Sequence, residues 1–247
     1  MGTFIPDRTD DTREGRPVEP DAACSTLIEE LQRRADPANV AGMARFGISG
    51  AETLGVSMRD VRALGREALM EHRRDGAWRH ALAERLWESG IHEARILATI
   101  AEDPGSVSPA QALAWARAVD SWDVCDQFCM NLLRRTPLAW ELVAEWTGRD
   151  EECVKRAGFV LIATLTVHAK GEPDSRFSEL LRLIPGGAAD ERPMVHKAVS
   201  WALRQVGKRG GSLHEEALAL AEELSGSGVR SARWVGRDAA RELRGRR

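Results

Sequence analysis

No apolar run in this sequence approaches the roughly 18–20 residues that a membrane-spanning helix needs, so no membrane partner is expected. Glycine-rich loops of the GxGxxG or Walker type are also missing, and nothing therefore supports a nucleotide cofactor. The six histidines form neither an HExxH motif nor part of an ordered Ser-His-Asp set. These absences remove the common signatures of several enzyme classes, and we expect no cofactor.

Cysteine is scarce, and its four positions show neither a CxxC pair nor the density of a disulfide-stapled domain. Cys125 and Cys129 lie one helical turn apart, a spacing that could bring two thiols to a metal ion. Structural metal sites usually take four protein ligands, and no second pair lies nearby. We therefore interpret both cysteines as small buried residues and predict no metal site.

The first 21 residues differ in composition from the rest of the chain. They hold six acidic residues and three arginines, and their net charge of −3 equals that of the whole chain, which leaves residues 22–247 neutral overall. They also hold three prolines and lack the apolar segment of a signal peptide. The sequence therefore predicts a disordered acidic leader over residues 1–21, a single domain over residues 22–247, and a cytoplasmic location.

Helical periodicity is present in almost every segment after the leader, and no segment shows sustained β alternation. Ser108-Pro109 and Thr136-Pro137 are typical helix starts, whereas Pro185-Gly186-Gly187 is predicted to break a helix. The predicted helices cover residues 22–34, 40–46, 58–72, 77–89, 91–102, 109–119, 121–134, 138–147, 151–169, 175–184, 192–208, 213–225 and 229–243.

These helices are short and are joined by short turns, which favours stacked antiparallel pairs. A pair takes about 40 residues, the length of a HEAT-like repeat. The predicted fold class is therefore all-α, a helical-repeat solenoid with a long concave face. An irregular globular helical bundle is the alternative, because the pairs share negligible sequence identity.

Trp122 and Asp126 are the most informative pair in the chain. They stand four residues apart, so a helix would place a flat aromatic surface and a carboxylate on one face, one turn apart. An ionised carboxylate that faces a core must be paired or protonated, and packing alone seldom selects one. We interpret the pair as the wall of a site.

Basic residues gather at three further places. Lys155 and Arg156 open an apolar helix, where the helix dipole favours anions instead. Residues 230–247 contain seven arginines and two acids, which suits either phosphate contacts or a soluble capping helix. The third place is a stripe on one predicted helical face, which is either an aromatic plate between cations or a solvated face: Lys197, Trp201, Arg204 and Lys208.

These motifs together resemble the AlkD-like DNA alkylation repair family in order and spacing, from about residue 24 to about residue 225. The residues that carry the resemblance are WDxxD at 122–126, KRA at 155–157 and KAxxWxLR at 197–204, with MARF at 43–46, LGVSxxDVR at 54–62 and ERLW at 84–87 upstream. Any one element is weak, but several in register are fairly specific.

The resemblance implies HEAT-like repeats that cradle duplex DNA in a concave basic groove. It also implies a monofunctional glycosylase that removes N3- and N7-alkylated purines without a metal and without base flipping. By position, Trp122 and Trp201 would contact the deoxyribose of the lesion, and Asp126 would be the catalytic carboxylate. Arg156 would hold the DNA backbone, and Phe46 stands where the family often has tyrosine. The further candidate DNA contacts are Phe46, Lys155, Lys197, Arg204 and Lys208.

The residues suit a cationic transition state. An alkylated purine already carries a positive charge, so it leaves readily and the sugar becomes oxocarbenium-like. A carboxylate stabilises this cation, and each aromatic face adds roughly 0.5–2 kcal/mol of cation–π attraction. The expected partner is double-stranded DNA that contains alkylated purines, bound by a monomer that associates with the nucleoid.

Two other functions are compatible with the sequence. One is a non-catalytic member of the same architecture that binds damaged or branched DNA. The other is a protein–protein scaffold, which the neutral charge of residues 22–247 favours. A steep fall of DNA affinity with salt would separate DNA binding from the scaffold.

Overall fold

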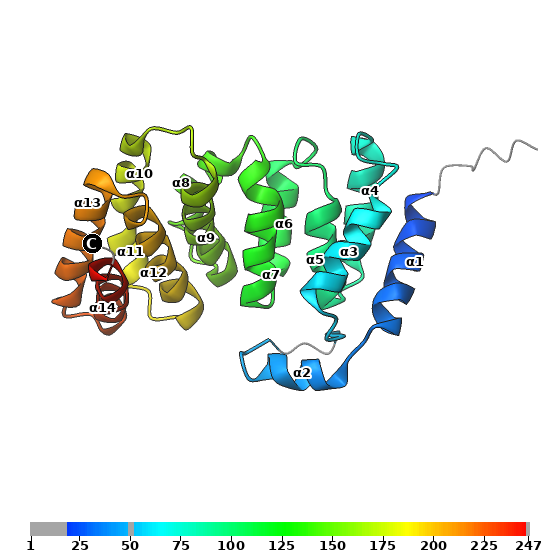
Figure 1. The fold of residues 1–247 in the computed structure, drawn as a ribbon, viewed down its shortest axis with the longest axis horizontal. Coiled ribbons are helices and arrows are strands. Elements are labelled where there is room, and N and C mark those ends of the chain that lie inside the picture. The colour runs from blue at the N-terminus through cyan, green and yellow to red at the C-terminus, as the bar shows by residue number, and fades with distance from the viewer. Residues whose placement is uncertain (1–18, 49–51, 246–247) are drawn as a thin grey trace, which may run out of the picture.

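A computed structural model describes residues 19–48 and 52–245 (Figure 1). Every element in these residues is a helix, which confirms the predicted all-α class. The elements are α1 (Pro20–Arg33), α2 (Pro37–Ala44), α3 (Met58–Ala68), α4 (Gly76–Glu88), α5 (His92–Ala101), α6 (Pro109–Ala118), α7 (Trp122–Gln127), the π-helical turn η1 (Phe128–Leu132), the 3₁₀ turn η2 (Leu133–Arg135), α8 (Ala139–Trp146), α9 (Glu152–His168), α10 (Asp174–Leu181), α11 (Ile184–Ala188), α12 (Pro193–Gly207), α13 (Gly211–Ser225) and α14 (Arg230–Arg244).

Capping side chains explain where several helices begin. Asp36 Oδ1 accepts a hydrogen bond from the backbone N–H of Ala38 at 2.9 Å, and Ser108 Oγ accepts one from that of Gln111 at 3.1 Å. Proline follows both caps at the first helical position, where its missing N–H costs nothing. The predicted start at Ser108-Pro109 is therefore confirmed.

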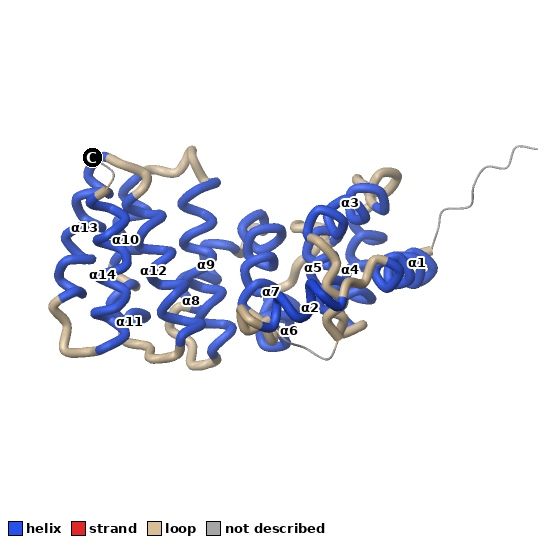
Figure 2. The backbone as a smooth tube through the Cα atoms, turned by 60° about the horizontal axis from the view of Figure 1, so that its bottom comes forward, coloured by secondary structure: helices blue, strands red, loops and turns tan. Residues whose placement is uncertain are grey.

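The helices form an extended array of two layers, with α1 at one end and α13 and α14 at the other (Figure 1). One layer consists of α3, α5, α7, α9, α12 and α14, each packed on the one before it. Helices of the second layer pack against these from outside, as α4 does on α5, α8 on α9 and α13 on α14 (Figure 2). This is the predicted HEAT-like arrangement.

Two glycines let neighbouring helices approach closely. A β-carbon at Gly158 of α9 would lie 2.7 Å from the backbone nitrogen of Thr147, at the end of α8. A β-carbon at Gly236 of α14 would lie 2.4 Å from the backbone nitrogen of Ser225, at the end of α13. Both distances are too short for real atoms, so these helix pairs depend on a residue without a side chain.

The structure corrects three local predictions. The helix expected over residues 121–134 is interrupted, because α7 passes into η1 and then η2. Pro185-Gly186-Gly187 lies within α11 instead of breaking a helix, since a proline in the first turn needs no donor. Thr136 does not cap α8, because its hydroxyl donates to the Leu133 carbonyl oxygen at 2.8 Å.

The predicted disordered leader falls largely on residues 1–18, which lie outside the described residues. Helix α1 begins at Pro20, and Asp21 pairs with Arg85 of α4 at 2.5 Å, so the end of the predicted leader belongs to the folded domain. Within the described parts of the chain, no helix combines the length and apolar character that crossing a membrane requires.

Candidate functional site

Asp126 lies near the end of α7, where it meets a buried arginine from the next helix of the layer. Arg156 of α9 donates to Asp126 Oδ1 from Nη2 at 2.8 Å and from Nε at 3.2 Å. Its Nη1 donates to the carbonyl oxygen of Met194 on α12 at 2.6 Å. The side chain of Arg156 is 6% exposed and that of Asp126 is 15% exposed. One guanidinium therefore joins three successive helices of the layer.

The protonation of Asp126 reflects two opposing effects. Burial raises the pKa of the Asp126 carboxyl to about 6, and the charge and hydrogen bonds of Arg156 lower it only in part. The carboxylate is therefore ionised at pH 7. Both hydrogen bonds from Arg156 go to Oδ1, and no described residue donates a hydrogen bond to Oδ2. The second oxygen is thus left to accept from a ligand or from water.

Trp122 stands one turn before Asp126, at the start of α7. Its indole Nε1 donates to the backbone oxygen of Phe46 at 2.9 Å, which ties α7 to the chain that follows α2. Trp122 is 36% exposed and Phe46 is 74% exposed, so both aromatic side chains present surface to solvent. Together with Met43 and Met58 they line a mostly apolar pocket of about 620 Å³.

Two acids support this pocket, the buried Glu93 and the half-buried Asp123, and the sequence did not reveal their roles. Glu93 accepts hydrogen bonds from the backbone nitrogens of residues 54–56 at 2.7–3.2 Å and so fixes the segment that precedes α3. Asp123 Oδ2 lies 2.9 Å from His92 Nε2. Burial acts to lower the pKa of His92, but the hydrogen bond and charge of Asp123 outweigh it and raise the pKa. Asp123 was visible within WDxxD, whereas nothing in the sequence pointed to Glu93.

Trp201 lies on the same layer but apart from Trp122. It follows Met194 by seven residues on α12, is half-buried, and packs against the hydrophobic core. No ring contact joins it to Trp122 in the described structure. The structure therefore brings Asp126 and Arg156 together directly, and it places each tryptophan on a helix that this pair links. The predicted sugar contacts of both tryptophans stay predictions.

The basic stripe of α12 is largely neutralised. Arg204 pairs with Glu242 of α14 at 2.5 Å and with Asp238 at 3.5 Å, and Lys208 also pairs with Glu242. Lys197 is exposed. Two of the three cations in the predicted stripe are therefore paired with acids of α14. DNA contacts by these residues stay predictions, which now require that ion pairs open.

Lys155 and Arg156 are also engaged within the protein. Lys155 Nζ lies 3.3 Å from Asp190 Oδ2, and its side chain is mostly buried. All three guanidinium nitrogens of Arg156 (Nε, Nη1 and Nη2) donate hydrogen bonds to acceptors within the protein. This arrangement therefore does not favour a direct contact between Arg156 and the DNA backbone. The geometry instead makes Arg156 the residue that orients Asp126.

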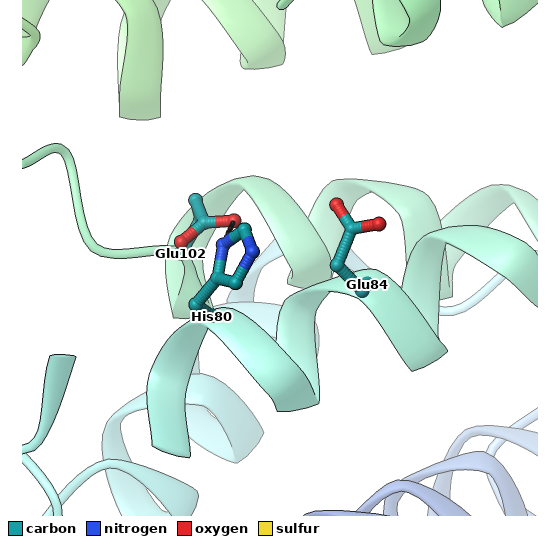
Figure 3. Close-up of side chains that lie close together, drawn as sticks. All are labelled: His80, Glu84 and Glu102. Atoms are coloured by element: carbon teal, nitrogen blue, oxygen red, sulfur yellow. Dashed lines mark hydrogen bonds and ion pairs between the residues drawn. The ribbon is translucent and has the colours of Figure 1, made fainter. Parts of the chain in front are cut away.

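A second polar cluster joins α4, α5 and α6. His80 and Glu84 share one face of α4, and Glu102 follows α5 (Figure 3). One ring nitrogen of His80 and one carboxylate oxygen from each glutamate lie within 4.8 Å of one another, so the three residues could in principle hold a metal ion. His80 Nδ1 lies 2.9 Å from Glu102 Oε2, and Gln111 Nε2 donates to Glu84 and Glu102 at 2.7 Å each. The amide of Gln111 thus occupies the space between the carboxylates, and we assign the cluster to helix packing.

Comparisons with known proteins agree with this architecture. The family model described as DNA alkylation repair enzyme matches residues 27–243. A solved structure is similar over 88% of this chain and 94% of its own, with a TM-score of 0.69 and 17% identity. It is described as a new family of proteins related to the HEAT-like repeat DNA glycosylases with affinity for branched DNA structures. At that identity the likeness concerns the fold. No curated protein matches the chain significantly.

Proposed function

The chain belongs to the family of DNA alkylation repair enzymes, and on this premise we propose that it hydrolyses the N-glycosidic bond of N3- and N7-alkylated purines in duplex DNA. The observation that supports the proposal most is the Asp126 carboxylate. Its Oδ1 is fixed by Arg156, its pKa of about 6 keeps it ionised at neutral pH, and its Oδ2 takes no part in that pairing.

In the proposed reaction the bond between C1′ and the purine nitrogen breaks, and its electron pair leaves with the base. The alkylated base is already cationic, so it departs as a neutral purine without prior protonation. The sugar becomes oxocarbenium-like, and Asp126 stabilises that charge as it develops. A water molecule then adds to C1′ and loses its proton to the carboxylate or to solvent. Arg156 acts as a positioning residue.

This mechanism predicts a selectivity between cationic and neutral lesions. The protein should release 7-methylguanine and 3-methyladenine from duplex DNA and leave uracil and hypoxanthine in place. A neutral base needs a protonated leaving group or a flipping pocket with contacts to the base edge. Chromatography of the bases released from matched duplexes measures this difference. Release of uracil as fast as 7-methylguanine would contradict the proposal.

The pH dependence follows from Asp126. Only the ionised carboxylate stabilises a cation, so activity should level off above about pH 7 and should fall about tenfold per unit well below pH 6. The measurement is kcat/KM for 7-methylguanine release between pH 5 and 8, because kcat/KM follows the pKa values of the free protein. Asp126→Asn should show a flat profile over the same range. A wild-type profile without a midpoint near pH 6 would separate the activity from this carboxylate.

A non-catalytic DNA-binding protein is the second candidate, and one observation favours it. Asp126 lies against a buried arginine, and the pair has no net charge, which is typical of a structural ion pair. This candidate gains support from the described affinity of the structurally similar protein for branched DNA. It predicts binding without base release. Equal, undetectable release by wild type and Asp126→Asn would favour it over the glycosylase.

A further inference from the structure

Helix α14 has two contrasting faces. Ala232, Val235, Ala239 and Leu243 are buried against the neighbouring helices. On the opposite side, the side chain of Trp234 is 41% exposed. Part of the indole packs on the protein, and the exposed part offers an aromatic surface to solvent.

Two hollows lie on either side of Trp234. The first, of about 360 Å³, is shared with the start of α12 and is lined by Pro193, His196 and Arg230, together with the acidic Glu191. The second, of about 510 Å³, is lined by the arginines of α14, including Arg237. Trp234 and Arg230 border both hollows. The two hollows therefore adjoin at the indole, and we refer to them together as the groove of α14.

The charge of this groove is positive and is only partly balanced. Arg241 pairs with Asp238 at 2.6 Å, and Arg233 donates to backbone oxygens at the turn before α14. Arg230 and Arg237 make no ion pair or side-chain hydrogen bond with any described residue. They differ in this respect from Arg204 and Lys208 of α12, which pair with acids of α14.

A cationic groove with an exposed indole matches the chemistry of an unpaired nucleic-acid strand. Arginines neutralise its phosphates, and the aromatic ring stacks on a base. A base inside a duplex is already stacked on its neighbours and cannot offer its face. One side of Trp234 lies near the His196 ring, with centroids 5.0 Å apart and planes tilted by 56°. The indole is thus supported within the groove.

The groove is also connected to the site described above. α14 packs on α12, and the carbonyl of Met194 at the start of α12 accepts a hydrogen bond from Arg156. His196, two residues further along α12, lines the first hollow. Asp126, Arg156, Met194 and this groove therefore follow one another across four successive helices of the layer.

We propose that this face of α14 binds an unpaired strand of DNA, with a base stacked on Trp234 and phosphates held by Arg230 and Arg237. The inference rests on the proposed function, because it assumes that the layer faces DNA. The groove of α14 would contact the single strand, in addition to the contact of the duplex with the proposed site at Asp126. Such a single strand extends from a duplex at a gap or a fork.

The test compares Trp234→Ala with wild type on two DNAs, a blunt duplex and the same duplex with a single-stranded extension. Fluorescence anisotropy should show that the variant loses about 5- to 100-fold in affinity for the extended DNA, the range for one stacked base. Its affinity for the blunt duplex should change by less than about twofold, since duplex bases cannot stack on the indole. Trp234→Phe should keep most of the affinity.

The two uncompensated arginines give a separate readout. Arg230→Gln/Arg237→Gln should lower the slope of log K against log salt for the extended DNA by roughly 1.4, since each phosphate of a single strand contributes about 0.7. Arg73→Gln/Arg74→Gln is the control, because it removes two exposed charges from the turn between α3 and α4, at the other end of the array. That control should leave the slope unchanged.

The outcomes keep this inference apart from the proposed function. Equal losses on both DNAs, or no loss on either, would overturn the unpaired strand as the occupant. Wild-type base release together with equal affinity for both DNAs would overturn the inference alone. Wild type that binds neither DNA would remove both proposals. Binding of an acidic peptide in place of the extended strand would also count against it.

Discussion

Replacing Asp126 with asparagine is expected to slow the release of 7-methylguanine from duplex DNA by about 10³-fold. A carboxylate about 4 Å from a unit positive charge, at an effective dielectric constant near 20, contributes roughly 4 kcal/mol of attraction. If this attraction arises mainly in the transition state, its loss lowers the rate by about three orders of magnitude. Single-turnover kinetics on methylated duplex measure the effect without interference from product release.

The asparagine variant should keep its affinity for DNA. The amide oxygen can still accept from Arg156, so the link between α7 and α9 is retained. Anisotropy with an uncleavable duplex provides this control. Asp126→Glu is the matched variant, because it keeps the charge and shifts its position by one methylene. A rate for Asp126→Asn within about threefold of wild type would exclude Asp126 from the chemical step.

Replacing Arg156 with methionine is expected to lower the free energy of unfolding by about 3–5 kcal/mol, because a buried carboxylate loses its partner. The carbonyl oxygen of Met194 also loses its donor. Arg156 lowers the pKa of Asp126, so the variant should have a pKa above 6 at this carboxyl. Activity at pH 7 should therefore fall and return as the pH rises. Urea unfolding and the pH profile measure the two effects.

A double variant tests whether the loss of stability in Arg156→Met comes from leaving Asp126 without its partner. Asp126→Asn/Arg156→Met removes both charges, so its destabilisation should be smaller than the sum of the single effects. Lys155→Met is a matched control from the preceding position, where the cationic side chain is more exposed, at 15% against 6% for Arg156. An Arg156→Met protein with wild-type stability and an unchanged pH midpoint would show that Arg156 does not hold the carboxylate.

The sequence allowed the architecture to be predicted because each helix has its own periodic apolar face and its own stop signals. Ser108 and Pro109 act locally, so their effect could be read without the fold. The π-helical turn η1 after Asp126 could not be predicted from the sequence, because it packs on α5 and α9 and so depends on the tertiary structure. Pro185 misled the prediction because proline is compatible with the first turn of a helix as well as with a break.

The candidate site was predictable only in part. An acid within a buried helical face marked Asp126 from sequence alone. The pairing of the cations was not visible, because each acid lies one repeat further along the chain. Asp190 is 35 residues from Lys155, and Glu242 is 38 residues from Arg204. Only the stacking of successive repeats brings these charges together. No local sequence pattern shows which residues of neighbouring repeats will lie side by side.

The bridge from Asp126 through Arg156 to Met194 has a mechanical consequence. It spans three helices in an array whose repeats contact only their neighbours, so bending is distributed along the stack. Any tightening or relaxing of the superhelix changes the spacing of α7, α9 and α12, and the guanidinium transmits that change to the carboxylate. The position of the Asp126 carboxylate is therefore tied to the local curvature of the array at these three helices.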